Sequence, residues 1–180
     1  MKLIFTVGLP TSGKSTLGAQ LGSRTETRFL DIDELASLCF GPPEENPYAT
    51  PEGADRDRKR MFGAYNVLAT AVNFSIACGD SIIIAGTFSR LAYWDLFLPI
   101  IKQHPGIEVR VVWCRILHDE ESIVTKRVER RGYRGGCRSL EHYLKDRERY
   151  VPPPQGIPQM IVDSSQPLEA YMDAVVEFVS

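Results

Sequence analysis

The chain has 180 residues, of which 43% are hydrophobic, and its formal net charge at pH 7 is −2. This length and composition predict a single domain, residues 1–180, with a sizeable apolar core. The slightly acidic balance argues against a broadly basic nucleic-acid-binding surface. No apolar stretch is long enough to span a membrane, so we expect a cytoplasmic protein with no membrane partner.

Short apolar runs alternate with segments of helical periodicity along the chain. The predicted strands are residues 2–7, 27–31, 81–85, 109–114 and 160–162. Apolar stripes at helical spacing within residues 61–76 and 168–179 predict helices that face the core. The alternation predicts an α/β fold, a five-stranded parallel sheet with helices on both faces. Ligands bind at the carboxyl ends of the strands in such sheets.

The first strand leads into a phosphate-binding loop. Residues 8–15, Gly-Leu-Pro-Thr-Ser-Gly-Lys-Ser, match the pattern G-x-x-x-x-G-K-[ST], and a helical segment follows them. The loop N–H groups and the helix N-terminus can hold phosphates, and Lys14 can reach the β- and γ-phosphates. We predict an ATP site with Ser15 as the Mg²⁺ ligand and Lys14 as a catalytic residue. The predicted nucleotide-binding residues are Gly8, Pro10, Thr11, Ser12, Gly13, Lys14, Ser15 and Thr16.

Two carboxylates follow the second predicted strand. Asp31 and Asp33 are two residues apart, so both would project to the same side of an extended backbone. A carboxylate at this place can orient an acceptor hydroxyl and take its proton. We predict Asp33 as this catalytic, substrate-binding residue, and Asp31 in a supporting role toward the substrate or toward Mg²⁺-bound water. The alternative is structural, because Asp33 precedes a helical pattern that it could cap.

Two further segments carry charge or proline. Residues 41–53 contain four prolines and are expected to form a mobile surface loop beside the acceptor, whereas the charged run 55–60 is expected to be a solvated helix face.

A helix is predicted over residues 120–131, with a basic C-terminal end. Arg127 and Arg131 share a helix face, and Gly132 is expected to end the helix. Arginines and glycines continue to residue 139, so residues 127–139 predict an arginine-bearing lid. Arg127 and Arg131 are the candidates for neutralising charge on the transferred phosphoryl group. The alternative is an ordinary solvated helix end, where cations complement the helix dipole.

Together these motifs resemble those of P-loop kinases of small molecules and of nucleic-acid 5′-ends. This group includes the AAA-33 type, the kinase domain of polynucleotide kinase, gluconate kinase, chloramphenicol phosphotransferase and the zeta toxins. The resemblance covers nearly the whole chain and implies a three-layer P-loop NTPase sandwich with an R-x-x-x-R lid. It also implies that Thr87 and Arg90, after the third strand, face the substrate, and that residues 162–165 pass near the adenine.

One departure from this resemblance concerns the metal. Relatives commonly end the third strand with an Asp that helps to hold Mg²⁺, whereas this strand continues into Ala85, Gly86 and Thr87. The resemblance implies an ATP- and Mg²⁺-dependent kinase that phosphorylates a hydroxyl group. The modest net charge favours a small-molecule acceptor, and the basic stretch 126–149 favours an oligonucleotide 5′-hydroxyl. The missing carboxylate instead points to an ATP-binding regulator with little or no catalysis.

Overall fold

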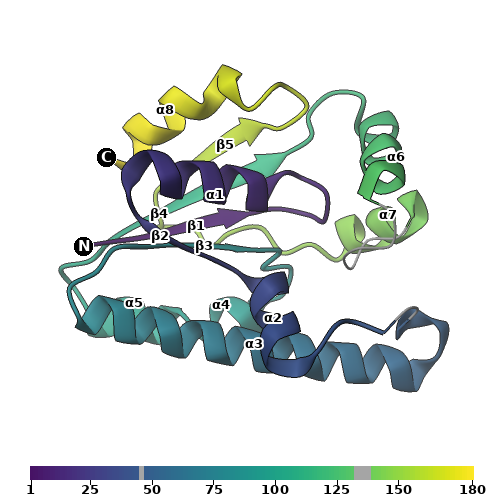
Figure 1. Cartoon of the computed structure of the whole chain (residues 1–180), viewed down its shortest axis with the longest axis horizontal. Coiled ribbons are helices and arrows are strands. Elements are labelled where there is room, and N and C mark those ends of the chain that lie inside the picture. The colour runs from purple at the N-terminus through teal and green to yellow at the C-terminus, as the bar shows by residue number, and fades with distance from the viewer. Residues whose placement is uncertain (45–46, 132–138) are drawn as a thin grey trace.

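The computed structural model describes residues 1–44, 47–131 and 139–180, with Arg131 described by its backbone alone. Five parallel strands form one sheet in the order β2-β3-β1-β4-β5, and helices cover both of its faces (Figure 1). The predicted α/β sandwich is therefore confirmed, and no strand end is displaced by more than one residue. The strands are β1 (Lys2–Val7), β2 (Arg28–Asp31), β3 (Ile82–Gly86), β4 (Glu108–Arg115) and β5 (Gln159–Asp163).

Alternate residues of the central strand enter two different cores. Phe5 of β1 lies in the core beneath α3 (Pro51–Ala77), α4 (Leu91–Trp94) and α5 (Leu98–Gln103). Ile4 lies in the opposite core, which α1 (Lys14–Thr25) and α8 (Glu169–Val179) cover. Both residues are almost fully buried, as expected for a parallel sheet covered on both faces.

Helices α6 (Glu120–Arg131) and α7 (Leu140–Glu148) lie beyond the carboxyl ends of the strands (Figure 1). A small core of Ile116, Val124 and Tyr143 holds them together, and Tyr143 Oη donates to Glu120 Oε1 at 2.7 Å. Helix α6 has the predicted bounds. The predicted helix stop at Gly132 and most of the predicted lid, residues 132–138, lie outside the described residues.

The proline-rich segment is shorter than predicted. After α2 (Ile32–Phe40) the chain forms a 3₁₀ turn at Pro47–Ala49, and α3 already begins at Pro51. The Thr50 hydroxyl caps α3 by accepting from Gly53 N at 3.1 Å, and a proline at the first helical position forfeits no helical hydrogen bond. The expectation that residues 41–53 form one loop is therefore wrong for its last three residues. Within the described ranges, no helix is long and apolar enough to cross a bilayer.

Candidate nucleotide and acceptor site

The backbone of the loop between β1 and α1 favours glycine at both of its ends. A Cβ atom at Gly8 would lie 2.4 Å from the Cys114 carbonyl oxygen, and Gly8 has φ +153°. Gly13 precedes α1 with φ +86°, a conformation that L-residues rarely adopt. The loop leaves the central strand of the sheet beside the switch in strand order, where α/β proteins bind ligands.

The interior of this loop has unused hydrogen-bonding capacity. Thr11 Oγ1 and Ser12 Oγ are buried and have no hydrogen-bond partner among the described residues. Thr11 also has φ +66°, a strained value of the kind that persists mainly at functional sites. Lys14 begins α1 and is 5% exposed. A loop of buried donors with a buried cation at a helix N-terminus fits a bound phosphate group.

The two predicted carboxylates do not share an extended backbone. Asp31 ends β2 and is the N-cap of α2, because its Oδ1 accepts from Asp33 N at 2.8 Å and from Glu34 N at 3.4 Å. Asp33 lies in the first turn of α2 and is exposed. The proposed alternative, that Asp33 caps this helix, is therefore wrong, since Asp31 fills that role. The expected parallel projection is wrong too, because helical backbone begins at Ile32.

The packing at the end of β3 leaves little space for a side chain at Gly86. A Cβ atom at Gly86 would lie 2.9 Å from both the Phe88 ring and the Tyr65 hydroxyl, so no larger side chain fits there without movement. A carboxylate is nevertheless present one strand away. Asp31 pairs in register with Ala85 of β3, and its Oδ2 atom is buried with no partner among the described residues.

Two aromatic side chains hold the turn that follows β3. Phe88 has φ +50°; its N–H donates to the Tyr65 hydroxyl at 3.0 Å, and its carbonyl accepts from Trp94 Nε1 at 3.1 Å. This turn carries both residues predicted to face the substrate, Thr87, which is half-buried, and Arg90, which is exposed and precedes α4. From the sequence alone, Tyr65 belongs to the apolar stripe within residues 61–76, which predicts only a core position. A hydroxyl group within an apolar stripe was the available signal.

Arg127 lies against the phosphate loop, on the side of β4 and β5. Its guanidinium donates to the Thr11 carbonyl at 2.8 Å and to the carbonyl of Ser164, in the loop after β5. It thus connects α6 with two loops at the carboxyl edge of the sheet. The side chain of Arg131, the second predicted lid arginine, lies outside the described part of the structure.

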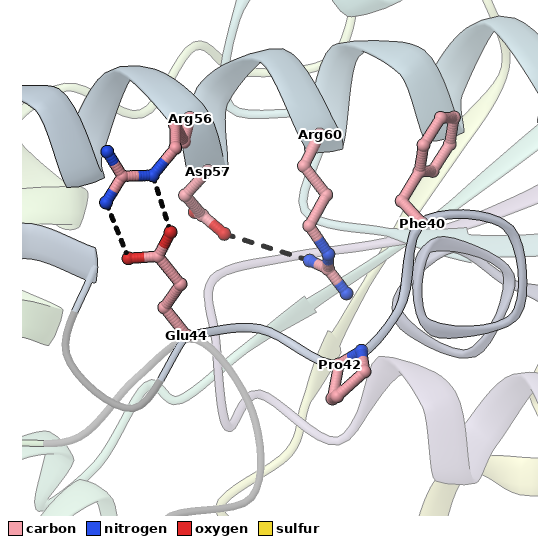
Figure 2. Close-up of a pocket in the computed structure, with 6 residues that line it drawn as sticks. All are labelled: Phe40, Pro42, Glu44, Arg56, Asp57 and Arg60. Atoms are coloured by element: carbon pink, nitrogen blue, oxygen red, sulfur yellow. Dashed lines mark hydrogen bonds and ion pairs between the residues drawn. The ribbon is translucent and has the colours of Figure 1, made fainter.

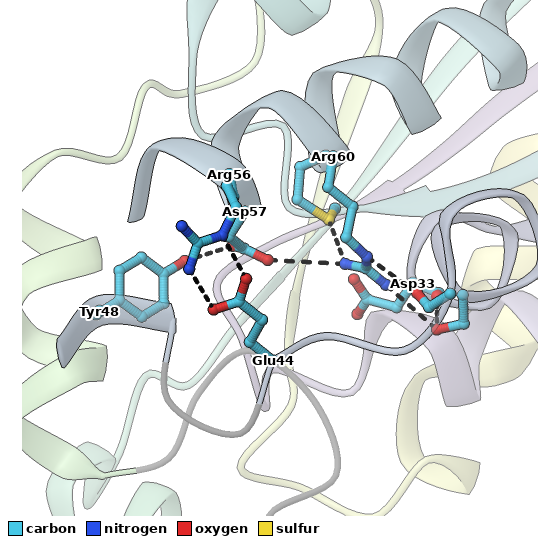
Figure 3. A network of polar contacts seen from close by, with 9 residues as sticks. Asp33, Glu44, Tyr48, Arg56, Asp57 and Arg60 are labelled. Atoms are coloured by element: carbon cyan, nitrogen blue, oxygen red, sulfur yellow. Dashed lines mark hydrogen bonds and ion pairs between the residues drawn. The ribbon is translucent and has the colours of Figure 1, made fainter. Parts of the chain in front are cut away.

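A polar network extends from Asp33 along the first half of α3 (Figure 3). The Ser37 hydroxyl donates to the Asp33 carbonyl at 2.9 Å and accepts from Arg60 at 3.4 Å. Arg60 faces Asp57 at 3.7 Å, and Tyr48 donates to Asp57 at 2.9 Å. The side chains of Arg60 and Asp57 are each only 14% exposed, so the expectation of a fully solvated face over residues 55–60 is wrong for these two.

Cys114, whose carbonyl lies against Gly8 of the phosphate loop, has no features of a nucleophile. Cys114 is buried in β4, and this burial raises the pKa of its thiol to about 12, against a smaller opposing effect of the Lys14 and Arg127 charges. Among the described residues, no group of His, Cys, Asp and Glu side chains forms a metal-binding cluster. Mg²⁺ does not need such a cluster, since it keeps several waters and binds to one or two carboxylates together with substrate phosphates.

Comparisons with known proteins agree with this geometry. The sequence profile of the AAA domain family AAA_33 matches residues 3–153. A candidate kinase of Chloroflexus aurantiacus has 22% identity and a TM-score of 0.74, covering 99% of this chain and 93% of its own. A gluconokinase of Sinorhizobium meliloti has 18% identity and a TM-score of 0.60, with 99% and 90% coverage.

A third solved structure contains a nucleotide. The deoxyadenosine kinase of M. mycoides with bound dATP has 14% identity and a TM-score of 0.65, with 98% of both chains covered. No curated protein sequence matches the chain. At these identities the similar structures establish the fold, which is that of P-loop kinases.

Proposed function

The chain belongs to the AAA domain family AAA_33, and from this premise we propose that it is an ATP-dependent kinase that phosphorylates a hydroxyl group. The observation that carries the proposal is the position of two functional elements at one sheet edge. A phosphate loop with buried Lys14 follows β1, whereas Asp31 ends β2 and Asp33 lies just after it; only β3 lies between the two strands. A donor phosphate and an acceptor hydroxyl could therefore meet above β3.

Asp33 is the proposed base. It would accept the proton of the acceptor hydroxyl while the hydroxyl oxygen forms a bond to the γ-phosphorus. The bond between this phosphorus and the β,γ-bridging oxygen breaks, and ADP leaves. The exposed position of Asp33 on the first turn of α2 gives a substrate access to its carboxylate. Lys14 would stabilise the negative charge on the β- and γ-phosphates, and Arg127 and Arg131 are proposed to add positive charge on the other side.

Mg²⁺ fits the donor atoms at this edge. Asp31 Oδ2 is buried and unpartnered among the described residues, and Ser15 lies in the first turn of α1. We propose that the Ser15 hydroxyl holds the ion directly and that Asp31 holds one of its waters, since Mg²⁺ keeps several waters and needs few protein ligands. When bound, the ion would neutralise charge on the β- and γ-phosphates.

The alternative proposal, an ATP-binding regulator without catalysis, rests on the absence of a carboxylate at the end of β3. Asp31 weakens this argument because it supplies a carboxylate in register with Ala85. Catalysis with a small-molecule acceptor therefore remains the preferred proposal. A net charge of −2 is poor support for an oligonucleotide acceptor, whose binding would depend on several phosphate contacts.

The test is transfer from γ-labelled ATP with Mg²⁺ by the wild type, Lys14→Ala and Asp33→Asn, using a library of small hydroxyl compounds and a 5′-hydroxyl oligonucleotide. We expect Lys14→Ala to abolish transfer. Asp33→Asn should lower turnover by about 10²- to 10⁴-fold while ATP binding stays nearly intact, since only the base is lost. Wild-type turnover in Asp33→Asn would refute the assignment of the base. ATP binding without transfer to any acceptor would favour the regulator.

A further inference from the structure

A cavity of about 330 Å³ lies between the end of α2, the segment after it and the first half of α3 (Figure 2). Small-molecule sites typically have volumes of ~300–1,000 Å³, so this cavity suits a small metabolite. The residues that line it are Phe40, Pro42, Glu44, Arg56, Asp57 and Arg60.

The cavity lies one helical turn from the proposed base. Arg60 in the cavity wall donates to the Ser37 hydroxyl at 3.4 Å. Ser37 lies one turn after Asp33 on α2 and donates to the backbone carbonyl of Asp33 at 2.9 Å. This contact reaches the main chain of Asp33 and not its carboxylate. Figure 3 shows Asp33 next to the guanidinium end of Arg60. A compound bound beside Arg60 would therefore lie near the first turn of α2, which carries Asp33.

The charged groups of the cavity balance one another. Two carboxylates, Glu44 and Asp57, face two guanidinium groups, Arg56 and Arg60. Arg56 and Glu44 form a bidentate pair at 2.6 and 3.1 Å. These four side chains have no net formal charge, so the lining favours neither an anionic nor a cationic ligand by its net charge. The wall still offers donors and acceptors for hydrogen bonds.

The Asp57–Arg60 pair leaves room for a hydroxyl group. Arg60 Nη1 and Asp57 Oδ1 are 3.7 Å apart, which is longer than a hydrogen bond. Both side chains are held in place, since Arg60 Nε donates to the Gly41 carbonyl at 3.1 Å and Asp57 Oδ2 accepts from Tyr48 at 2.9 Å. A ligand hydroxyl can donate to the carboxylate and accept from the guanidinium at once. Such pre-organisation lowers the entropy cost of binding.

Two of the lining residues are apolar, Phe40 and Pro42. Phe40 is 47% exposed, and its ring packs over Gly63, where a Cβ atom would lie 2.8 Å from the ring. Figure 2 shows the Arg60 side chain between Phe40 and Pro42. The aromatic ring and the proline offer a surface to C–H groups, whereas the charged lining residues can bond hydroxyl groups. A small molecule that carries both kinds of group matches this lining.

We propose that this cavity binds the acceptor and that the acceptor is a neutral polyhydroxylated compound of sugar size, selected by Arg60 and Asp57. That the bound compound is the acceptor rests on the proposed kinase function. Its binding does not, because the cavity is separate from the phosphate loop.

The test separates binding from transfer by using Lys14→Ala alongside the wild type. Neutral aldoses and alditols of four to six carbons are each paired with the matching aldonic acid, and dissociation constants are measured by saturation-transfer NMR. At least one neutral compound should bind both proteins about tenfold more tightly than its acid, because the acid adds an uncompensated charge. Absence of binding by every neutral compound, or tighter binding of the acids, would overturn the proposal.

Substitutions then locate the bound compound. Arg60→Gln should weaken binding about tenfold or more, since a charge-assisted hydrogen bond is lost. Asp57→Asn should shift preference toward the acids, because it removes the carboxylate that pairs with Arg60 at 3.7 Å. The matched control is Lys59→Gln, whose side chain is 78% exposed and pairs with Asp55 outside the cavity. It should bind like the wild type.

Two further results distinguish this inference from the kinase proposal. If a neutral polyhydroxylated compound binds and Arg60→Gln weakens its binding, but no phosphoryl transfer occurs, the kinase proposal is refuted. The proposal that the cavity is a polyol site, a site for such a compound, is then supported. Transfer to an oligonucleotide or a small acid that is unaffected by Arg60→Gln would support a kinase and refute the polyol site.

Discussion

At the scale of single residues, Tyr65 and Trp94 hold the turn after β3 in a conformation that its sequence disfavours. Phe88 has φ +50°, which is unusual for a bulky residue. Tyr65 accepts from its N–H and Trp94 donates to its carbonyl, so both buried backbone groups are satisfied. Burial raises the pKa of Tyr65 well above its usual range, so the hydroxyl stays neutral and keeps its proton.

We expect Tyr65→Phe to destabilise the fold by about 1–3 kcal/mol, because the Phe88 N–H loses its partner in a buried site. Since this turn carries Thr87 and Arg90, acceptor turnover should fall while ATP affinity changes little. Denaturant unfolding and ATP titration calorimetry measure the two effects. Tyr171→Phe is the control, because Tyr171 packs against the opposite core. Equal stability of Tyr65→Phe and the wild type would contradict the role given to this hydroxyl.

At the scale of elements, the junction of β2 and α2 depends on one carboxylate with two roles. Asp31 Oδ1 caps α2, and its Oδ2 is buried without a partner among the described residues. Capping contributes to stability, whereas the second oxygen is available to a metal-bound water. Since asparagine retains one acceptor oxygen but not the charge, the two roles can be separated by substitution.

We expect Asp31→Ala to lower stability by about 1 kcal/mol through loss of the cap, and Asp31→Asn to lower it much less. Both should require more Mg²⁺ for half-maximal transfer, because neither has a carboxylate. Thermal unfolding and a Mg²⁺ titration of turnover measure the two properties. An unchanged Mg²⁺ requirement in Asp31→Asn would remove Asp31 from the proposed metal site.

A second element-scale contact connects α6 with the nucleotide loops. The Arg127 guanidinium donates to the Thr11 carbonyl and to the Ser164 carbonyl. Carbonyl partners indicate that the side chain positions both loops, in addition to any role toward the transferred phosphoryl group.

We expect Arg127→Gln to weaken ATP binding by about tenfold, since two charge-assisted hydrogen bonds to the loops are lost. Lys126→Gln, a change at an exposed neighbour on the same helix, should have little effect. Isothermal titration with a non-hydrolysable ATP analogue separates binding from transfer. Normal binding with slow transfer in Arg127→Gln would assign the residue to catalysis alone.

At the scale of the whole molecule, Asp163 holds together two segments at the carboxyl end of the sheet. These are the connection between β4 and α6 and the loop after β5. Asp163 Oδ1 accepts from Leu117 N at 3.1 Å, before α6, and from Ser165 N at 3.0 Å, after β5. Burial by itself raises the pKa of Asp163, but these hydrogen bonds and one from the Ser165 hydroxyl outweigh it and hold the pKa below its usual range. The ionised form is thus favoured in the folded state.

Because the pKa of Asp163 is lower in the folded state, its ionised carboxylate stabilises the fold at pH values above its unfolded pKa of about 4. This stabilisation is lost as the pH falls through the folded pKa. We expect the free energy of unfolding of Asp163→Asn to depend less on pH than that of the wild type below about pH 4. Asp173→Asn, an exposed control paired with Arg24, should follow the wild type. Chemical unfolding at a series of pH values tests this, and identical slopes for Asp163→Asn and the wild type would refute it.

Local patterns in the sequence determined the architecture. The strand at 2–7, the glycines of the phosphate loop and the helix at 120–131 were predictable because apolar periodicity and glycine backbone freedom act over a few neighbouring residues. Strand–helix alternation similarly determined the parallel sheet, and hence the sheet edge at which the phosphate loop and Asp31 lie.

Only the tertiary structure decided which side chains share a site. The partners of Tyr65, Arg60 and Arg127 are distant in sequence, and such contacts leave no local periodicity. Tyr65 resembles a core residue and Arg60 a solvated one until α2, α3 and the turn after β3 pack together. Which aspartate caps α2 likewise depends on the residue at which the strand ends and the helix begins. The spacing of Asp31 and Asp33 in the sequence does not define that residue.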